Sequence, residues 1–380
     1  METISYGAPT SVYSGVDCLN NNKRIISSFG RRAFIITSRF SQNCRNFALE
    51  DILRIFSENG TEYAVYDEAE ENPSVGSIVQ VAERIRAFAP EYIFAIGGGS
   101  ALDTAKAANV LINYPPQADA YEVFYSGTPC INNCNSGALP MLAVPTTAGS
   151  GSEVMGFSIL TRSDTNTKLR INQLSFFAAA FLDARYVASS PLWLLDTGVM
   201  DALSHGIEGV LNTRSSSLSR MWNYHGFSLF AKFKDALASG TPGDEECGQM
   251  LLAAAVQGMG NMQCGSTIPH GMGYALTHFK NVPHGIANMM VMPAFLRTIH
   301  DKDAVNDIVH ACGFESLDDF EEYVLKIVRR NVRIEVTEEE LDAWARECAS
   351  LTPRLEAHIE PISATQIRAI FSAAIDACNR

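Results

Sequence analysis

The chain has 380 residues, of which 47% are hydrophobic and 19% are charged, and its formal net charge is −13. This composition is typical of a globular protein, and the length favours two domains. The acidic charge argues against nucleic acid or an anionic membrane as a partner, because both would be repelled. The sequence shows neither a signal peptide nor an apolar stretch of about 20 residues, so we predict a cytoplasmic protein without a membrane span.

The nine cysteines are odd in number and scattered along the chain, which does not indicate a disulfide framework. Only Cys130 and Cys134 lie close together. A structural zinc site would need a second such pair, so we interpret these two as part of an ordinary loop. A reducing compartment fits this cysteine usage.

The first half of the chain alternates short apolar runs with amphipathic segments. The runs predict strands at 33–37, 61–66, 92–96, 141–144, 157–161 and 178–183. The amphipathic segments predict helices at 45–57, 74–88 and 101–111, and residues 115–138 resemble a loop. Repeated strand–helix–strand units indicate an α/β domain with a parallel, doubly wound, Rossmann-like sheet.

The strand pattern stops near residue 190, and the remaining chain has helical periodicity. The predicted helices cover 194–211, 221–237, 250–262, 304–312, 317–328, 338–349 and 364–378. We therefore predict a nucleotide-binding α/β domain of residues 1–187 and an all-α domain of residues 188–380.

Two loops rich in small residues follow predicted strands. Gly97-Gly-Gly-Ser100 opens a predicted helix, whose free N–H groups and dipole favour a phosphate. Pro145-Thr-Thr-Ala-Gly-Ser-Gly-Ser-Glu153 offers hydroxyls and flexible backbone after another strand. Either stretch alone could be an ordinary turn. Together they predict a dinucleotide site, because open α/β sheets bind ligands at the carboxyl ends of their strands.

Four residues of the second half form a candidate metal site. Asp201 and His205 are four residues apart, so on a helix they share one face. His270 and His284 could complete a cluster of one carboxylate and three imidazoles, which suits a divalent transition metal. An isolated Asp-x3-His pair is more often a cap or a surface pair, so this site depends on its context.

Taken together, these stretches resemble the iron-containing (group III) alcohol dehydrogenases. The matching motifs are Asn72-Pro73, Gly97-Gly-Gly-Ser100 with Asp103 and Lys106, Pro145 to Glu153, Gly198 to Glu208, and His270-Gly-Met through Pro283-His-Gly285. The resemblance implies an N-terminal dinucleotide-binding domain and a C-terminal metal-binding domain, in a dehydroquinate synthase-like architecture. It also implies an active site in the cleft between the domains.

By position, the resemblance implies that Asp201, His205, His270 and His284 bind Fe2+, although the same donors suit Zn2+. The ion would act as a Lewis acid on an alcohol or aldehyde oxygen while the nicotinamide carries the hydride. The implied cofactor contacts are Asn72, Gly98, Gly99, Ser100, Thr146, Thr147, Ser150 and Lys168.

The chain departs from the family pattern after its first predicted strand. NAD-selective members usually carry an Asp there, whereas this chain has Ser38 and Arg39. A carboxylate repels a 2′-phosphate, and a hydroxyl with a guanidinium can bind one. This departure predicts NADP(H) over NAD(H), the alternative being an exposed arginine and dual specificity.

Further departures concern the substrate pocket. Tyr274 stands where many members have a further His, and we take it as a candidate catalytic residue. A phenol works in acid–base catalysis only if its pKa is lowered, so packing or substrate orientation is its favoured role. Asn261 stands where a Phe commonly lines the pocket, and Phe157 is expected to close it. His278 and Lys280 either recognise a hydroxyl or carboxylate or lie at the surface.

We therefore predict a metal-dependent alcohol dehydrogenase or aldehyde reductase, a homodimer acting on a small polar alcohol or aldehyde. Alternatives in the superfamily are a zinc-dependent glycerol-type polyol dehydrogenase, a hydroxy-acid dehydrogenase of the 4-hydroxybutyrate type, and a lyase-like sugar-cyclising relative. A non-catalytic metal- or nucleotide-binding protein is the alternative from another class, and it predicts cofactor binding without turnover.

Overall fold

The computed structural model describes residues 4, 7–39, 47–126, 138–162 and 167–380. Cys130, Cys134 and the start of the helix expected at residue 45 lie outside the described residues. The chain forms two compact units. We call Gly7–Thr147 with Gly151–Ser190 the α/β unit, and Pro191–Arg380 with Ala148–Ser150 the helical unit.

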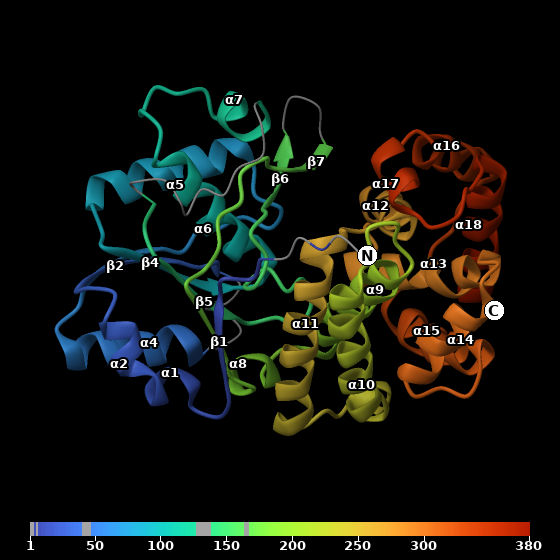
Figure 1. Ribbon diagram of the computed structural model, residues 1–380, viewed down its shortest axis with the longest axis horizontal. Coiled ribbons are helices and arrows are strands. Elements are labelled where there is room, and N and C mark those ends of the chain that lie inside the picture. Colours follow the sequence, from blue (N-terminus) through green and yellow to red (C-terminus); the bar gives the residue numbers. More distant parts are fainter. Residues whose placement is uncertain (1–3, 5–6, 40–46, 127–137, 163–166) are drawn as a thin grey trace. The chain divides into compact units, whose positions relative to one another are not determined.

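The α/β unit is built on one parallel sheet with the strand order β1-β8-β5-β4-β2-β3 (Figure 1). Its strands in the described chain are β1 (Ser11–Ser14), β2 (Arg32–Ile36), β3 (Glu62–Tyr66), β4 (Tyr92–Gly97), β5 (Met141–Pro145) and β8 (Ala179–Leu182). Every residue of β4, β5 and β8 is buried, as expected for the centre of a sheet with helices on both faces. The Rossmann-like prediction is confirmed.

Helices cover both faces of this sheet (Figure 1). On one face lie α1 (Cys18–Asn21), α2 (Lys23–Ser27) and α4 (Phe47–Asn59), and on the other lie α5 (Val75–Phe88) and α6 (Gly99–Leu111). The apolar side of α4 faces the strands, because Ile52, Ile55 and Phe56 recur at helical spacing. The Phe56 ring meets Tyr92 and Phe94 of β4 edge-on, with ring centroids 6.3 and 6.1 Å away.

The structure corrects three local predictions in this unit. The strand expected at 157–161 is β6 (Ile159–Arg162), but it pairs antiparallel with β7 (Thr167–Arg170) in a separate hairpin. The stretch interpreted as a loop contains α7 (Ala120–Tyr125), which begins because Asp119 accepts hydrogen bonds from two backbone N–H groups of its first turn. The edge strand β1 was missed because its outer residues are exposed and it has only four residues.

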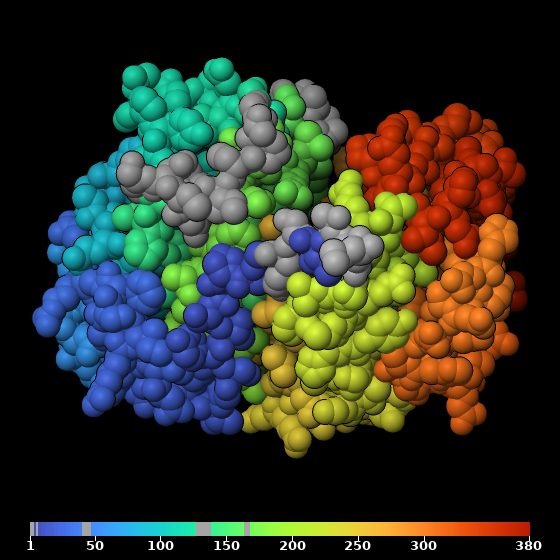
Figure 2. Space-filling view, in the orientation of Figure 1, coloured from blue at the N-terminus to red at the C-terminus, as the bar shows by residue number. Residues whose placement is uncertain are grey.

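The helical unit contains no strand among its described residues, as the sequence predicts. Its helices are α9 (Leu192–Val210), α10 (Ser217–Ser239), α11 (Asp244–Cys264), α12 (Ile268–Lys280), α13 (His284–Thr298), α14 (Lys302–Ala311), α15 (Leu317–Asn331), α16 (Glu338–Cys348), α17 (Thr352–Ala357) and α18 (Ala364–Asn379). Figure 2 shows the yellow residues of α10 against the orange residues of α14 and α15. The sequence analysis missed α12 and α13, which carry two of the predicted metal ligands.

The described cysteines form no disulfide bond with one another. All six, Cys18, Cys247, Cys264, Cys312, Cys348 and Cys378, are free and buried. Burial raises the pKa of the Cys247 thiol to about 11, which keeps it protonated and unreactive. Within the described chain, no helix is both long enough and apolar enough to span a membrane.

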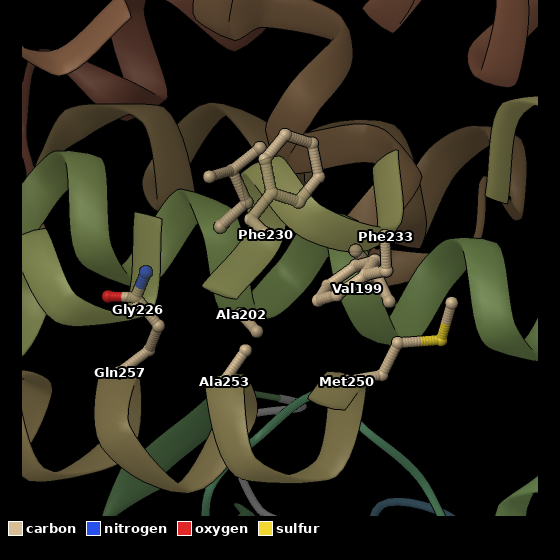
Figure 3. A pocket seen from close by; sticks show the side chains of 9 residues that line it. Val199, Ala202, Gly226, Phe230, Phe233, Met250, Ala253 and Gln257 are labelled. Carbon is tan, nitrogen blue, oxygen red and sulfur yellow. The ribbon is translucent and has the colours of Figure 1, made fainter. Parts of the chain in front are cut away.

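Helices α9, α10 and α11 approach closely around the buried side chain of Gln257. This side chain lies between two glycines: a Cβ at Gly226 would be 2.5 Å from it, and a Cβ at Gly206 would be closer still. Figure 3 shows the amide beside Gly226, at the edge of a cavity of about 10 Å3. The two glycines therefore let three helices pack around one polar side chain, and one of them, Gly206, directly follows His205 in the chain.

We expect Gly206→Ala to lower the free energy of unfolding by about 1–3 kcal/mol, because its methyl group overpacks against Gln257. Ala is the better helix former, so the packing effect must exceed a propensity gain of about 1 kcal/mol. Gly76→Ala in α5 is the matched control, since its Cβ would meet only Ser74 Oγ at 3.9 Å. Chemical denaturation should show a lower midpoint for Gly206→Ala alone; equal midpoints would contradict the packing argument.

Candidate active site

Three helices of the helical unit bring the four predicted metal ligands together. The Nε2 atoms of His205, His270 and His284 lie 3.9, 3.6 and 3.7 Å from one atom, Oδ1 of Asp201. Asp201, His270 and His284 present ligand atoms that are all within 4.8 Å of one another. His205 lies outside that tighter group, but its ring stacks on His270 with centroids 4.7 Å apart.

These distances are better explained by a cation shared between the carboxylate and the imidazoles than by direct hydrogen bonds between them. They exceed hydrogen-bond length, whereas two ligands about 2.1 Å from one tetrahedral ion are about 3.4 Å apart. His270 Nε2 is buried and has no hydrogen-bond partner among the described residues, although it points toward Asp201. An orphaned imidazole nitrogen facing a carboxylate is expected where a metal completes the site. The donor set therefore fits a divalent ion.

The imidazoles also control the charge of the carboxylate. Burial by itself would raise the pKa of Asp201, but the opposing charges of His205, His284 and His270 hold it well below its ordinary value. Burial has the opposite effect on a base and lowers the pKa of His205. Asp201 is therefore an anion at neutral pH, which is the state of a carboxylate that binds a metal.

Glu208 orients one of these ligands, and the sequence analysis assigned it no role. Its carboxylate is fully buried, and one oxygen pairs with His270 Nδ1. The other oxygen accepts hydrogen bonds from Thr267 N at 2.5 Å and Thr267 Oγ1 at 3.1 Å. Binding at Nδ1 turns Nε2 of His270 toward Asp201. The sequence spacing could have predicted this role, since Glu208 is seven residues after Asp201 and shares its helix face.

Asn288 is a second residue that the sequence analysis missed. Its Nδ2 donates to Asp201 Oδ1 at 3.1 Å and lies 3.2 Å from His284 Nε2. It is on α13, one turn after His284, so the helix places both side chains on the same face. Asn288 therefore fixes the carboxylate and the imidazole relative to each other.

Tyr274 lies directly beside the cluster. Its ring stacks on His284 with centroids 4.9 Å apart and an angle of 20° between the planes. Burial raises the pKa of the phenol above its ordinary value, although Arg354 opposes the shift. Tyr274 therefore stays protonated at neutral pH and is suited to donating a hydrogen bond rather than to accepting a proton.

The other residues predicted for the substrate pocket are more dispersed. Asn261 is buried on α11. Phe157 belongs to the α/β unit, where the guanidinium of Arg170 lies 4.8 Å from its ring centroid. Lys280 pairs with Glu340 at 2.8 Å, and His278 is exposed. A substrate role for Asn261 and Phe157 stays a prediction, whereas Lys280 already has a carboxylate partner.

The carboxyl ends of β4 and β5 bring the two predicted cofactor loops together in the α/β unit. Thr146 N donates to Gly97 O at 3.0 Å. A Cβ at Gly98 would lie 3.1 Å from Thr147 Oγ1, so only glycine lets the two loops touch without a shift. Helix α6 begins at Gly99, and its first N–H groups are available to an anion.

Three other predicted cofactor residues also meet in the α/β unit, although they are far apart in sequence. Asn72 N donates to Ser100 Oγ at 3.2 Å, and Lys168 Nζ donates to Asn72 Oδ1 at 2.8 Å. Asn72 has a φ of 57°, and its carbonyl accepts a hydrogen bond from Thr161 Oγ1 at 3.0 Å. Ser150, in contrast, belongs to the helical unit.

The pair expected to recognise a 2′-phosphate has a neighbour that the sequence analysis did not consider. Arg39 forms an ion pair with Glu68, and Ser38 is joined to Glu68 by an isolated antiparallel bridge. The guanidinium is largely exposed, so salt screens this pair. A phosphate bound by Arg39 would have to compete with the Glu68 carboxylate.

Comparisons with known proteins identify the family of this chain. The chain matches the model for iron-containing alcohol dehydrogenases over residues 9–184 and the model for the C-terminal part of the Fe-containing alcohol dehydrogenase family over residues 195–375. Lactaldehyde reductase of Escherichia coli (strain K12) is 30% identical over 269 residues, which cover 70% of this chain and 68% of that protein.

Two further relatives extend the comparison. NADPH-dependent butanol dehydrogenase of Clostridium saccharobutylicum is 27% identical over 305 residues, covering 77% of this chain and 74% of that protein. The crystal structure of an iron-containing alcohol dehydrogenase from Thermotoga maritima is similar with a TM-score of 0.85 and 29% identity, covering 98% of this chain and all of that one. The chain therefore belongs to the iron-containing alcohol dehydrogenase family and is an oxidoreductase.

Proposed function

We propose that this protein is an iron-dependent aldehyde reductase, or alcohol dehydrogenase in reverse, for a small polar substrate. The observation that carries the proposal is the convergence of three imidazole nitrogens on Oδ1 of Asp201. A divalent ion bound there would polarise the substrate carbonyl and stabilise alkoxide character as hydride arrives from the nicotinamide. Asp201, His205, His270 and His284 would hold the ion, with Glu208 and Asn288 keeping two of these ligands oriented.

The α/β unit supplies the residues that we propose for the nicotinamide cofactor. Gly98 and Thr147 would leave room for the diphosphate, and the first turn of α6 would donate N–H groups to it. Asn72 and Lys168 offer polar atoms for the riboses. Hydride transfer requires this nicotinamide to reach the substrate at the metal, so the proposed reaction needs the residues of both units.

Tyr274 would orient the substrate rather than act as its base. Its phenol is protonated and lies against His284, so it can donate a hydrogen bond beside the metal. We propose Fe2+ as the ion, with Zn2+ as the alternative that the same donors accept. The homodimer and the cytoplasmic location expected from the sequence stay predictions.

The test is a steady-state assay of NADPH and NADH oxidation with a panel of small aldehydes. The protein is supplied anaerobically with Fe2+, Zn2+ or Mn2+ in separate preparations. We expect turnover with Fe2+ and with two- to four-carbon aldehydes that carry a polar group. Highest activity with Zn2+ and glycerol would favour the polyol dehydrogenase instead. Cofactor binding without turnover under all conditions would refute the proposed reductase activity and favour a non-catalytic binding protein.

We propose a preference for NADP(H) from Ser38 and Arg39, and the NADPH-dependent butanol dehydrogenase to which the chain is similar supports it. Ser38→Asp should shift the ratio of kcat/KM for NADPH and NADH toward NADH by about tenfold or more, since a new carboxylate repels the 2′-phosphate. Glu68→Gln should shift it the other way, because it releases Arg39 from its ion pair. A parent enzyme that already prefers NADH would contradict the proposal.

A further inference from the structure

Arg354 is a cation held close to the metal site, and the sequence analysis gave it no role. It lies on α17, which packs on α12 (Figure 1). Its stem passes over Gly271, the residue after His270, where a Cβ would lie 3.3 Å from Arg354 Cδ. Its Nη1 donates to Ser266 Oγ at 2.7 Å and to Thr267 O at 3.3 Å. The guanidinium is therefore fixed to the turn that leads into His270.

The guanidinium also faces the aromatic ring beside the metal ligands. Arg354 Cζ lies 5.1 Å from the centroid of Tyr274, whose ring is 4.9 Å from that of His284. These two contacts place the guanidinium within about 10 Å of the His284 ring. An extended four-carbon chain spans about 4 Å between its end carbons. Contacts of about 2 Å to a metal at one end and about 3 Å to a guanidinium at the other add to this span, so a carboxylate at the far end could reach Arg354 while the aldehyde oxygen is at the metal.

The charge of Arg354 is not neutralised by an ion pair among the described residues. Both oxygens that its Nη1 contacts are neutral. Two other partly buried arginines of this chain differ in this respect, since Arg185 pairs with Asp183 at 2.7 Å and Arg330 pairs with Asp196. Glu208 is influenced by Arg354, but its two carboxylate oxygens are occupied by His270 and Thr267. A half-buried guanidinium without a carboxylate partner is suited to binding an anion.

We propose that Arg354 recognises a carboxylate on the far end of the substrate, so that the enzyme acts on an aldehyde carrying a carboxylate three to four carbons along the chain. The planar guanidinium can bind both carboxylate oxygens, and its contacts with Tyr274, Ser266 and Thr267 hold it in place. This proposal rests on the proposed function, because it needs the substrate oxygen at the metal. Arg354 would then decide which aldehydes are accepted, and it would determine which end of the substrate lies at the metal.

The test compares 4-oxobutanoate with butanal, two aldehydes of equal chain length that differ in the terminal carboxylate. In the iron-loaded wild type, 4-oxobutanoate should have the higher kcat/KM. Arg354→Met should lower kcat/KM for 4-oxobutanoate by about 30- to 1000-fold, mainly through KM, because a charged hydrogen-bonded partner is lost. The ratio of kcat/KM for 4-oxobutanoate to that for butanal should fall by at least about tenfold, because butanal loses only what the contacts of Arg354 with the turn before His270 contribute. Arg354→Lys should recover part of the loss, because a lysine keeps the charge but not the bidentate geometry.

Arg346→Met on α16 is the matched control, since Arg346 is exposed and should leave both aldehydes unaffected. Metal content is measured for each variant. Equal losses for butanal and 4-oxobutanoate in Arg354→Met would overturn the proposal and make Arg354 purely structural. A wild type that prefers butanal would also overturn it.

A binding measurement separates this proposal from the proposed function. Calorimetry should show that 4-hydroxybutyrate binds the metal-loaded wild type more tightly than 1-butanol, and that Arg354→Met removes the difference. If no aldehyde is turned over but this difference exists, the proposed function fails and the anion site at Arg354 stands. If aldehydes are turned over and the difference is absent, the anion site fails alone.

Discussion

Replacing His284 by alanine should remove the bound metal and leave nicotinamide binding nearly intact. Asp201 Oδ1 is the atom on which the three imidazoles converge, and His284 Nε2 is 3.7 Å from it. Losing a residue that only orients a ligand typically weakens metal binding 10- to 100-fold, so losing a ligand should weaken it by more than about 100-fold. Apart from Ser150, the predicted cofactor residues lie in the α/β unit, whereas His284 belongs to the helical unit. Catalytic activity should fall with the metal content.

The measurement is metal content per chain after anaerobic loading and desalting, together with the Kd for NADPH from fluorescence. His278→Ala is the matched control, because His278 is an exposed histidine outside the cluster. The control should keep both its metal and its activity. Wild-type metal content in His284→Ala would refute the ligand assignment, and loss of metal from His278→Ala as well would point to damage of the helical unit.

Replacing Lys106 by methionine should destabilise the protein by about 3–5 kcal/mol, as expected when one partner of a buried ion pair is removed. Lys106 is fully buried on α6, and its Nζ lies 3.0 Å from Asp103 Oδ1. It also donates to Ser152 Oγ at 2.7 Å and to the carbonyl oxygens of Met155 and Phe157 at 3.2 and 2.5 Å. The ammonium group of Lys106 thus links α6, which begins in the glycine-rich loop, to residues 152–157 at and after the end of the second cofactor loop.

Burial disfavours the charged form of Lys106 and lowers its pKa below the ordinary value. The neighbouring Asp103 carboxylate acts in the opposite direction but does not cancel this effect. Methionine fills a similar volume but takes this donor away from the Met155 and Phe157 carbonyls, and it leaves the Asp103 carboxylate, which keeps the Ser152 hydroxyl and the Ile159 N–H, without its cation. NADPH binding should weaken because Gly99 and Ser100 open the same helix. Metal content should not change, because the metal ligands belong to the helical unit.

A double-mutant cycle tests this account. Asp103→Asn combined with Lys106→Met removes both charges, and asparagine keeps an oxygen for the N–H of Ile159, which now donates to Asp103 at 2.9 Å. The double variant should be less destabilised than the sum of the single variants, by about 1 kcal/mol or more. Additive losses in denaturation midpoints would show that the pair is not coupled, and a stable Lys106→Met would refute the buried-cation argument.

Local patterns in the sequence were sufficient for much of the fold. The apolar runs at β4 and β5 and the amphipathic α5 depend on residues close together in the chain, and they fold where the sequence predicts. The elements that were missed depend on their surroundings. The edge strand β1 is held by pairing with β8, more than 160 residues later, so its four residues alone could not reveal it.

The sequence by itself determined which residues we propose as metal ligands, because Asp201 and His205 share a helix face and the motifs around His270 and His284 resemble a known family. Only the tertiary structure decided what surrounds them. Glu208 behind His270, Asn288 between Asp201 and His284, and the pairing of Arg39 with Glu68 all join residues from separate elements. Side chains distant in sequence acquire these partners only when helices pack, and that packing, not residue type, sets which charges are neutralised and which remain available to a ligand.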